Sequence, residues 1–207
     1  MEKICKLRFE SIAQGGAAVA RLEGKTVFIE GGAPDETALC RVIEEHKTWA
    51  KAEMLEIIEA SPVRINAACD LYGVCGGCHL QHIKYEAPLG AKTAILTDCF
   101  AKIGHLHPPP VEVFSSPAWE YRNRMQFHKE ATDRGNGVIL GLKGREGIVA
   151  VRDCPIAESG IRSLLQGGAG KNLNLPPDKD RFTVFSKDGL LLNEGGKERG
   201  KIRLMNK

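Results

Sequence analysis

Four of the seven cysteines in this chain have a spacing that suits metal binding. Cys69, Cys75 and Cys78 follow one another in the run ACDLYGVCGGCHLQH, and Cys154 stands far from them in VRDCPIA. Four thiolates are the ligand set of an iron–sulfur cluster and also of a closed tetrahedral zinc site. The sequence therefore predicts that the protein holds metal.

The local sequence around these cysteines supports this prediction. Gly76 and Gly77 separate Cys75 from Cys78, and glycines at positive φ can turn backbone N–H groups towards sulfur. Pro155 follows Cys154, as a proline follows the fourth cysteine of ferredoxin-type runs. The spacing does not distinguish iron–sulfur from zinc, and four unrelated buried cysteines are the remaining alternative.

The other thiols and two nearby imidazoles have simpler interpretations. Cys5, Cys40 and Cys99 lie among apolar neighbours, so each is interpreted as a small buried hydrophobic residue. His79 and His82 lie beside the cysteine run and are alternative zinc ligands. With four cysteines at hand, they are better interpreted as polar residues at the start of a helix packed against the cofactor.

The pattern of apolar, polar and glycine residues changes along the chain and predicts three parts. Residues 1–60 alternate apolar and polar residues in short runs separated by glycine pairs, the pattern of strands in a small barrel. Residues 61–107 hold the cysteine run, then apolar residues at helical spacing that end at Gly104, although Pro88 and Gly90 interrupt the pattern. Residues 108–207 predict further strands, a short helix in PIAESGIRSLLQ and a closing hairpin.

A strand in WEYRNRMQFHKE would carry the best candidates for contact with a nucleic acid. Alternate residues of a strand share a face, so Arg122, Arg124 and Gln126 would point one way. Guanidinium groups bind phosphate and stack on unpaired bases. The alternative is an ordinary solvated polar face.

Composition limits the class of protein. The odd number of cysteines and the lack of a leader pattern at the N-terminus argue against a secreted disulfide framework and favour the reducing cytoplasm. No apolar run approaches the roughly 18 residues that cross a bilayer, so no membrane partner is expected. The formal net charge of +3 means that a nucleic-acid surface would be local.

Several of these motifs occur together in one known family. The string C-x5-CGGC-x-LQH-x3-Y follows a glycine-rich barrel pattern and precedes W-x-YR-N-R, LG and D-CP. In this order the motifs resemble the RNA uracil-5-methyltransferases that carry an N-terminal TRAM domain and a [4Fe-4S] cluster. The resemblance covers the N-terminal half of such an enzyme and implies four cluster ligands: Cys69, Cys75, Cys78 and Cys154.

The resemblance also implies a fold and a partner. The expected fold is mainly β with some α: an OB-like TRAM β-barrel over 1–60, a small helical iron–sulfur segment over 61–107, and a β-rich central RNA-binding domain over 108–207 that supplies Cys154. The expected partner is a structured RNA, ribosomal or transfer, and not DNA.

No catalytic residue is predicted in this sequence. In the family a further domain binds S-adenosylmethionine and supplies the attacking cysteine and the base. No strand, glycine-rich turn and helix of the kind that binds such a cofactor appears here. The chain is expected not to methylate RNA alone, and a separate methyltransferase chain is one way to complete it. The rival interpretations are a zinc-stapled RNA-binding module and an iron–sulfur electron-transfer protein.

Overall fold

A computed structural model describes residues 3–131, 138–167, 181–187, 190–194 and 202–204. The chain forms two compact units, one of Met1–Ala67 with His79–Ser115 and one of Ala68–Cys78 with Ser116–Lys207. The predicted iron–sulfur segment 61–107 is therefore divided between them. Its cysteine loop groups with the second unit, whereas the residues on either side of the loop group with the first.

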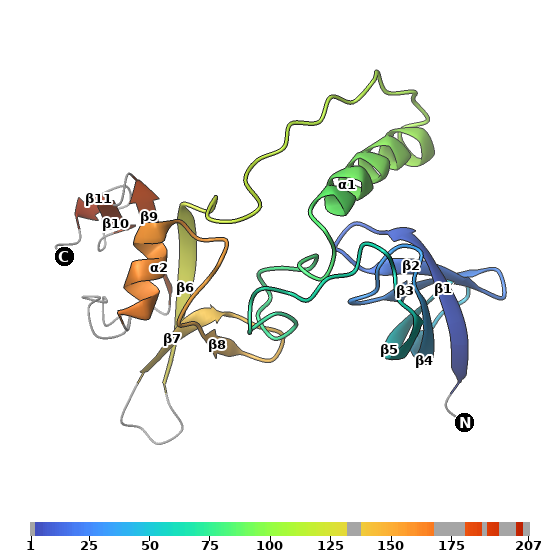
Figure 1. Ribbon diagram of the computed structural model, residues 1–207, viewed down its shortest axis with the longest axis horizontal. Helices are drawn as coiled ribbons and strands as arrows, with labels where there is room; N and C mark the ends of the chain where they lie inside the picture. Colours follow the sequence, from blue (N-terminus) through green and yellow to red (C-terminus); the bar gives the residue numbers. More distant parts are fainter. Residues whose placement is uncertain (1–2, 132–137, 168–180, 188–189, 195–201, 205–207) are drawn as a thin grey trace. The chain divides into compact units, whose positions relative to one another are not determined.

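The first unit is built on a closed barrel of five strands (Figure 1). Strands β3 and β5 pair in parallel and the other neighbours pair antiparallel. Alternating small and branched side chains fill the interior, which confirms the predicted barrel. In barrel order the strands are β1 (Ile4–Ile12), β2 (Ala18–Leu22), β3 (Lys25–Ile29), β5 (Trp49–Glu59) and β4 (Thr37–Glu45).

The turns of the barrel occur where the sequence places glycine. Gly15, Gly16 and Gly31 from the two glycine pairs all have positive φ. Between β2 and β3 the two turn residues Glu23 and Gly24 have φ of 51° and 81°. Positive φ at both central residues is the requirement of a type I′ turn, whose twist matches that of a two-stranded hairpin.

A buried ion pair fixes the chain that follows the barrel. Glu36 has no exposed surface, and both of its carboxylate oxygens accept hydrogen bonds from the guanidinium of Arg64. The carboxylate also accepts from the backbone N–H of Ala33 at 3.2 Å and of Ser61 at 3.4 Å. Arg64 further donates to the carbonyl of Gly31 at 2.7 Å. These bonds hold the segment after β5 against the loop before β4.

The segment after the cysteine loop forms one helix that packs on the barrel. Helix α1 (Glu86–Asp98) continues as a π-helical turn η1 (Cys99–Ile103) and ends at Gly104, as predicted. Pro88 does not break this helix because it lies in the first turn, where backbone N–H groups have no partner inside the helix. Ala91 packs against the barrel core.

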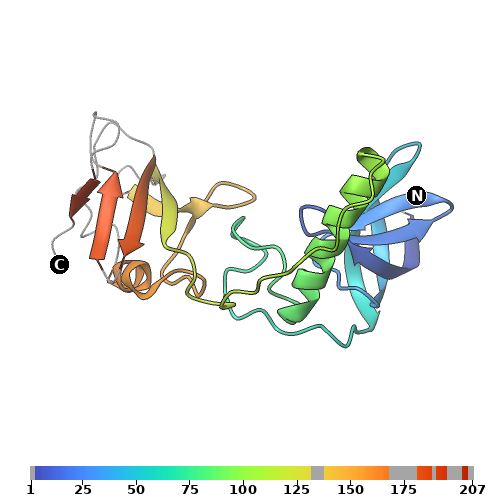
Figure 2. The ribbon, with the colours of Figure 1, turned by 90° about the horizontal axis from the view of Figure 1, so that it is seen from above.

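The second unit is an antiparallel sheet covered by a short helix (Figures 1 and 2). Helix α2 (Ser159–Gln166) packs on β9 and buries Ile161, Leu164 and Leu165. Of the helices in the described residues, none has both the length and the apolar character needed to cross a membrane. The sheet order is β11 (Ile202–Leu204), β10 (Leu190–Glu194), β9 (Arg181–Lys187), β6 (Arg124–Ala131), β7 (Val138–Lys143) and β8 (Ile148–Ala150).

Candidate metal centre and RNA-binding face

The cysteine loop is a series of tight turns anchored on one hairpin of the second unit. Within the loop, the N–H of Tyr72 donates to the carbonyl of Cys69 at 3.0 Å and the N–H of Cys75 donates to that of Leu71 at 2.8 Å. Gly76 donates to the carbonyl of Lys143, the last residue of β7, at 3.2 Å. A Cβ on Gly76 would stand 2.9 Å from that carbonyl oxygen, so the close approach requires glycine.

Cys154 lies at the edge of the core of the same unit and is 9% exposed. Leu71 and Cys78 of the cysteine loop pack against this core. All four predicted ligands, Cys69, Cys75, Cys78 and Cys154, thus belong to the second unit. Cys78 and Cys154 thus meet at one core, and a common site for all four cysteines stays a prediction.

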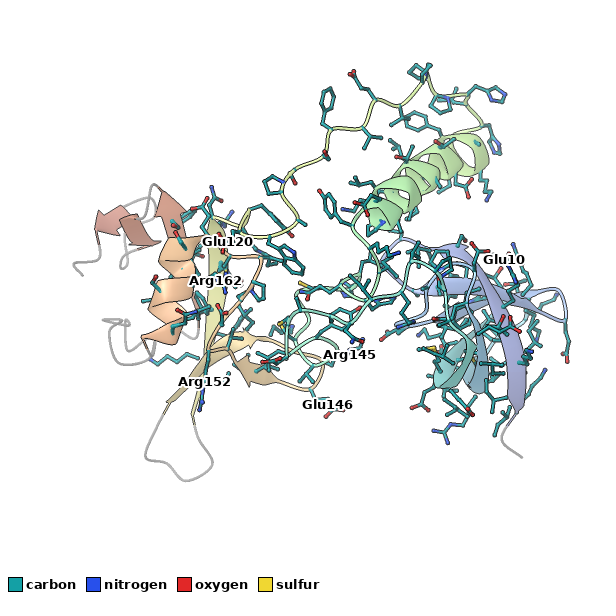
Figure 3. All side chains as sticks on the ribbon, in the orientation of Figure 1. Glu10, Glu120, Arg145, Glu146, Arg152 and Arg162 are labelled. Atoms are coloured by element: carbon teal, nitrogen blue, oxygen red, sulfur yellow. The ribbon has the colours of Figure 1, made fainter. Side chains whose placement is uncertain are left out.

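A network of charged groups positions the backbone of Cys154. Its N–H donates to Oδ1 of Asp153 at 2.8 Å. The guanidinium of Arg162 on α2 donates to both oxygens of that carboxylate, at 2.9 and 2.8 Å. Arg162 also donates to Glu120 at 2.7 Å, and these two side chains lie side by side in Figure 3. The hydrogen bonds from Arg162 hold the pKa of Asp153 below its usual value. The network connects helix α2 to the residue before the predicted ligand.

The thiols influence one another electrostatically. Burial raises the pKa of Cys154, and negative charge on Cys78 and Cys69 raises it further. The sulfur of Cys154 is therefore within electrostatic range of Cys78 and of Cys69. A metal cation would supply the positive charge that keeps them as thiolates. In its chemistry the donor set suits a metal that prefers sulfur.

The described residues do not form a preorganised metal-binding site. No three histidine, cysteine, aspartate or glutamate side chains among them are grouped tightly enough to hold an ion. The alternative imidazole ligands belong to the first unit: Nε2 of His82 lies 2.9 Å from the carbonyl oxygen of Gly32, and its side chain is buried. His79 lies against Gly16 of the barrel. Both histidines belong to the first unit, and the four cysteines belong to the second.

The predicted RNA-contacting residues lie at the start of β6. Arg124 and Gln126 are exposed, whereas Met125 and Phe127 between them are buried in the core, as strand alternation requires. Arg122 is also exposed but precedes the strand, and its guanidinium donates to the backbone carbonyl of Arg124 at 3.2 Å. Two of the three predicted residues therefore share one face of the sheet.

Strand β9 adds two residues to this face that the sequence did not single out. Phe185 pairs with Arg124 across the strands, and the guanidinium carbon lies 5.4 Å from the centre of the phenyl ring. Arg181 is exposed at the other end of the same strand. We call the four residues Arg124, Gln126, Arg181 and Phe185 the Arg124 face. Because alternate residues of a strand share a face, a strand in RFTVFSK would have predicted Arg181 and Phe185 on the same face.

Cations on the barrel are mostly paired with acids. Lys25 lies 2.5 Å from a carboxylate oxygen of Glu45, and Arg41 contacts Glu53. Arg21 donates to Thr26 at 2.6 Å. Such pairing lowers the net positive potential that these side chains offer to phosphate. The Arg124 face is therefore the better candidate for contact with a polyanion.

Comparison with known proteins identifies one domain family and several relatives that match this chain. Residues 4–55 match the TRAM domain family. A 23S rRNA (uracil(1939)-C(5))-methyltransferase of Azoarcus sp. is 35% identical over 159 residues, which is 75% of this chain and 37% of the relative. An uncharacterized RNA methyltransferase of Aquifex aeolicus is 33% identical over 166 residues, 79% of this chain and 38% of that protein.

One solved structure has the same fold over most of the chain. The tRNA (uracil-54, C5)-methyltransferase of Pyrococcus abyssi, in complex with S-adenosyl-L-homocysteine, superposes with a TM-score of 0.55 at 20% identity. The match covers 89% of this chain and 44% of that one. The chain thus spans less than half the length of each of these relatives.

Proposed function

We propose that this chain, which is homologous to the N-terminal part of the RNA uracil-C5 methyltransferases, is the RNA-binding and [4Fe-4S]-carrying portion of such an enzyme. The observation that carries the proposal is that the four cysteines and an exposed arginine face belong to the same unit. In this role the chain works in the cytoplasm on a structured RNA, ribosomal or transfer.

The cluster in this proposal is structural. Cys69, Cys75, Cys78 and Cys154 are its four ligands, and it would hold the cysteine loop against the core of the second unit. Backbone bonds already anchor the loop at Lys143 and fix Cys154 through Asp153. Because all four ligands come from the protein, no open position is left at the metal for a substrate.

The Arg124 face would hold single-stranded RNA. A guanidinium stacked on a phenyl ring presents its outer face to a base, and its N–H groups are free to approach phosphate oxygens. Gln126 beside it offers a donor and an acceptor for the edge of a base. Arg181 extends the positive charge along the neighbouring strand.

Methylation itself needs chemistry that we assign to another domain. The C5 carbon of uracil becomes nucleophilic only after a thiolate adds at C6, and the C5 proton must then be removed by a base. The family resemblance puts both groups, and the S-adenosylmethionine pocket, in a domain for which this sequence carries no pattern. The chain would recognise the RNA and that domain would transfer the methyl group.

Replacing Arg124 tests the RNA-binding face. Arg124→Ala should weaken binding of a fluorescently labelled RNA hairpin with a uridine-rich loop by roughly 5- to 100-fold, as expected for the loss of one stacking contact. Arg124→Lys keeps the charge but not the planar group, so it should recover only part of the affinity. Fluorescence anisotropy at several salt concentrations gives the dissociation constants. Unchanged affinity in Arg124→Ala, with the folded state verified by circular dichroism, would remove this face from the proposal.

A further inference from the structure

Two aromatic rings stack on the outer surface of the barrel, at the hairpin between β4 and β5. The imidazole of His46 lies on the indole of Trp49, with the ring centres 4.0 Å apart and an angle of 22° between the planes. Phe28 on β3 meets the same indole edge-on, with the ring centres 6.3 Å apart. Its neighbours Val27 and Ile29 are buried in the barrel, so Phe28 faces outwards. We call His46, Trp49 and Phe28 the His46 platform.

Hydrogen bonds hold the two stacked rings in place. The backbone N–H of His46 donates to the carbonyl of Trp49 at 2.8 Å and closes the turn of the hairpin. A carboxylate oxygen of Glu44 accepts from Nζ of Lys51 at 2.7 Å, and the other lies 2.8 Å from Nε2 of His46. The imidazole is thus fixed by a contact at its edge while its face lies on the indole. A surface that is fixed in advance loses little entropy when a ligand binds.

The platform presents aromatic surface and little net charge. The side chain of His46 is 48% exposed although Trp49 covers one of its faces, so the opposite face is open to solvent. The ammonium of Lys51 lies 5.5 Å from the centre of the indole, and Glu44 offsets its charge. Unpaired bases of RNA stack on such aromatic side chains, and this contact does not require a cation at a phosphate.

The position of the platform in the barrel favours the same ligand. In OB-folds the face of strands 2 and 3 and the loops after strands 1 and 4 bind oligonucleotides. Here Phe28 comes from β3, and His46 follows β4 directly. The five strands also close in the order β1-β2-β3-β5-β4. The aromatic surface therefore lies on the part of the barrel that suits a single strand.

We infer that the His46 platform stacks one unpaired base of the bound RNA. This inference rests on the proposed function, which gives the chain an RNA ligand, and it adds a site in the other unit from the Arg124 face. The two sites differ in kind. The Arg124 face offers guanidinium groups to phosphate, whereas the platform offers an aromatic surface to a base.

Removal of both stacked rings from the intact chain tests the platform. His46→Ala/Trp49→Ala should weaken binding of the labelled RNA hairpin with a uridine-rich loop by roughly 5- to 100-fold, the range for loss of one stacked base. Both rings must be removed, because His46→Ala alone uncovers the indole as a second stacking surface. His46→Phe keeps a flat ring and should bind within about twofold of the native chain. Ile43→Ala, at a 62% exposed position of β4 outside the platform, should also stay within about twofold.

The salt dependence of binding distinguishes a stacked base from a phosphate contact. Stacking releases no counterions, so the dependence of log Kd on the logarithm of the salt concentration should have the same slope in the native chain and in the double variant. Loss of a contact with one phosphate would reduce that slope by about 0.7 for a single strand. A reduced slope in the double variant would therefore overturn base stacking at the platform.

The native chain provides a second measurement that does not depend on the folding of the double variant. The sequence contains two tryptophans, so isotopically labelled protein gives two indole N–H signals in an NMR spectrum. Trp49→Phe, which keeps an aromatic ring at this position, identifies the signal of Trp49. Saturating RNA hairpin should shift that signal in the native chain. A signal that does not move would overturn the inference.

The outcomes keep this inference distinct from the proposed function. Native affinity in a double variant that is folded by circular dichroism, with Arg124→Ala still weakening binding, would overturn the platform and leave the proposed function standing. Absence of RNA binding by the native chain would overturn both. The iron content of the same samples reports on the cluster independently, since the platform lies in the other unit from the cysteines.

Discussion

Replacing Arg64 with methionine is expected to destabilise the first unit by about 3–5 kcal/mol, the cost of leaving a buried carboxylate without its partner. Glu36 is fully buried, and Arg64 supplies the charge that compensates it. Methionine keeps most of the apolar length of the arginine side chain but removes every N–H donor. The free energy of unfolding, measured by urea denaturation at pH 7, gives the effect directly.

The pH dependence gives this prediction a second signature. Burial acts to raise the pKa of Glu36, but Arg64 and two backbone N–H groups outweigh it and hold the pKa below its usual value. The stabilisation from Glu36 is therefore present above its unfolded pKa of about 4.3 and is lost as the pH falls through the folded pKa. Without Arg64, burial raises the pKa, and the variant loses stability as the pH rises through that value. The difference between the two proteins should shrink between pH 7 and about pH 4.

An exposed ion pair of the same barrel provides the matched control. Arg8 lies 3.1 Å from Asp35, and both side chains are about two-thirds exposed, at 66% and 68%. Arg8→Met should cost less than about 1 kcal/mol, the usual value for a surface pair. Equal losses in Arg8→Met and Arg64→Met would show that the buried pair contributes nothing special to the barrel.

Replacing Cys154 with serine is expected to remove the iron–sulfur cluster and to lower the melting temperature of the second unit by more than about 5 °C. Serine has nearly the same shape but does not supply the thiolate that the cluster requires. Without the cluster, the cysteine loop keeps its backbone bonds to the β7–β8 hairpin and the packing of Leu71 and Cys78 on the core, but loses the metal bonds that would join it to Cys154. Visible absorption, iron content and a thermal melt of anaerobically purified protein measure the two effects.

The matched control is Cys99→Ser in the helix of the first unit. Cys99 is partly buried and lies outside the predicted ligand set, so this variant should keep the iron and the colour of the native protein. A Cys154→Ser variant with an unchanged melting curve would defeat the structural role of the cluster. Loss of iron in both variants would mean that the ligand set is wrong.

Local patterns in the sequence were enough to predict the barrel and the ends of several elements. Alternation of apolar residues and positive φ at glycine are local properties, so the strands of the barrel and its turns follow from short stretches of sequence. Gly104 ends the helix as predicted, but with φ of −80° and ψ of −16°, so no left-handed backbone is involved there. The alternation of Arg124 and Met125 across β6 was predicted correctly because it needs no partner strand.

Contacts between distant residues were not predictable in this way. Glu36 and Arg64 are both of types that are usually exposed, and nothing local indicates that they meet. Phe185 joins Arg124 only through the register of β9 against β6, which the packing of the whole sheet decides. The apolar spacing in α1 was visible, but the sequence did not indicate that Leu96, Phe100 and Ile103 would remain exposed.

The central claim of this account is that four cysteines of the second unit hold a [4Fe-4S] cluster. The most direct test is the visible absorption spectrum of anaerobically purified protein, with iron and zinc determined on the same sample. We predict a broad band near roughly 400 nm and about four irons per chain. A colourless protein with one zinc per chain would contradict the claim and favour a zinc-stapled RNA-binding module, and a reversible redox couple at the iron would instead indicate electron transfer.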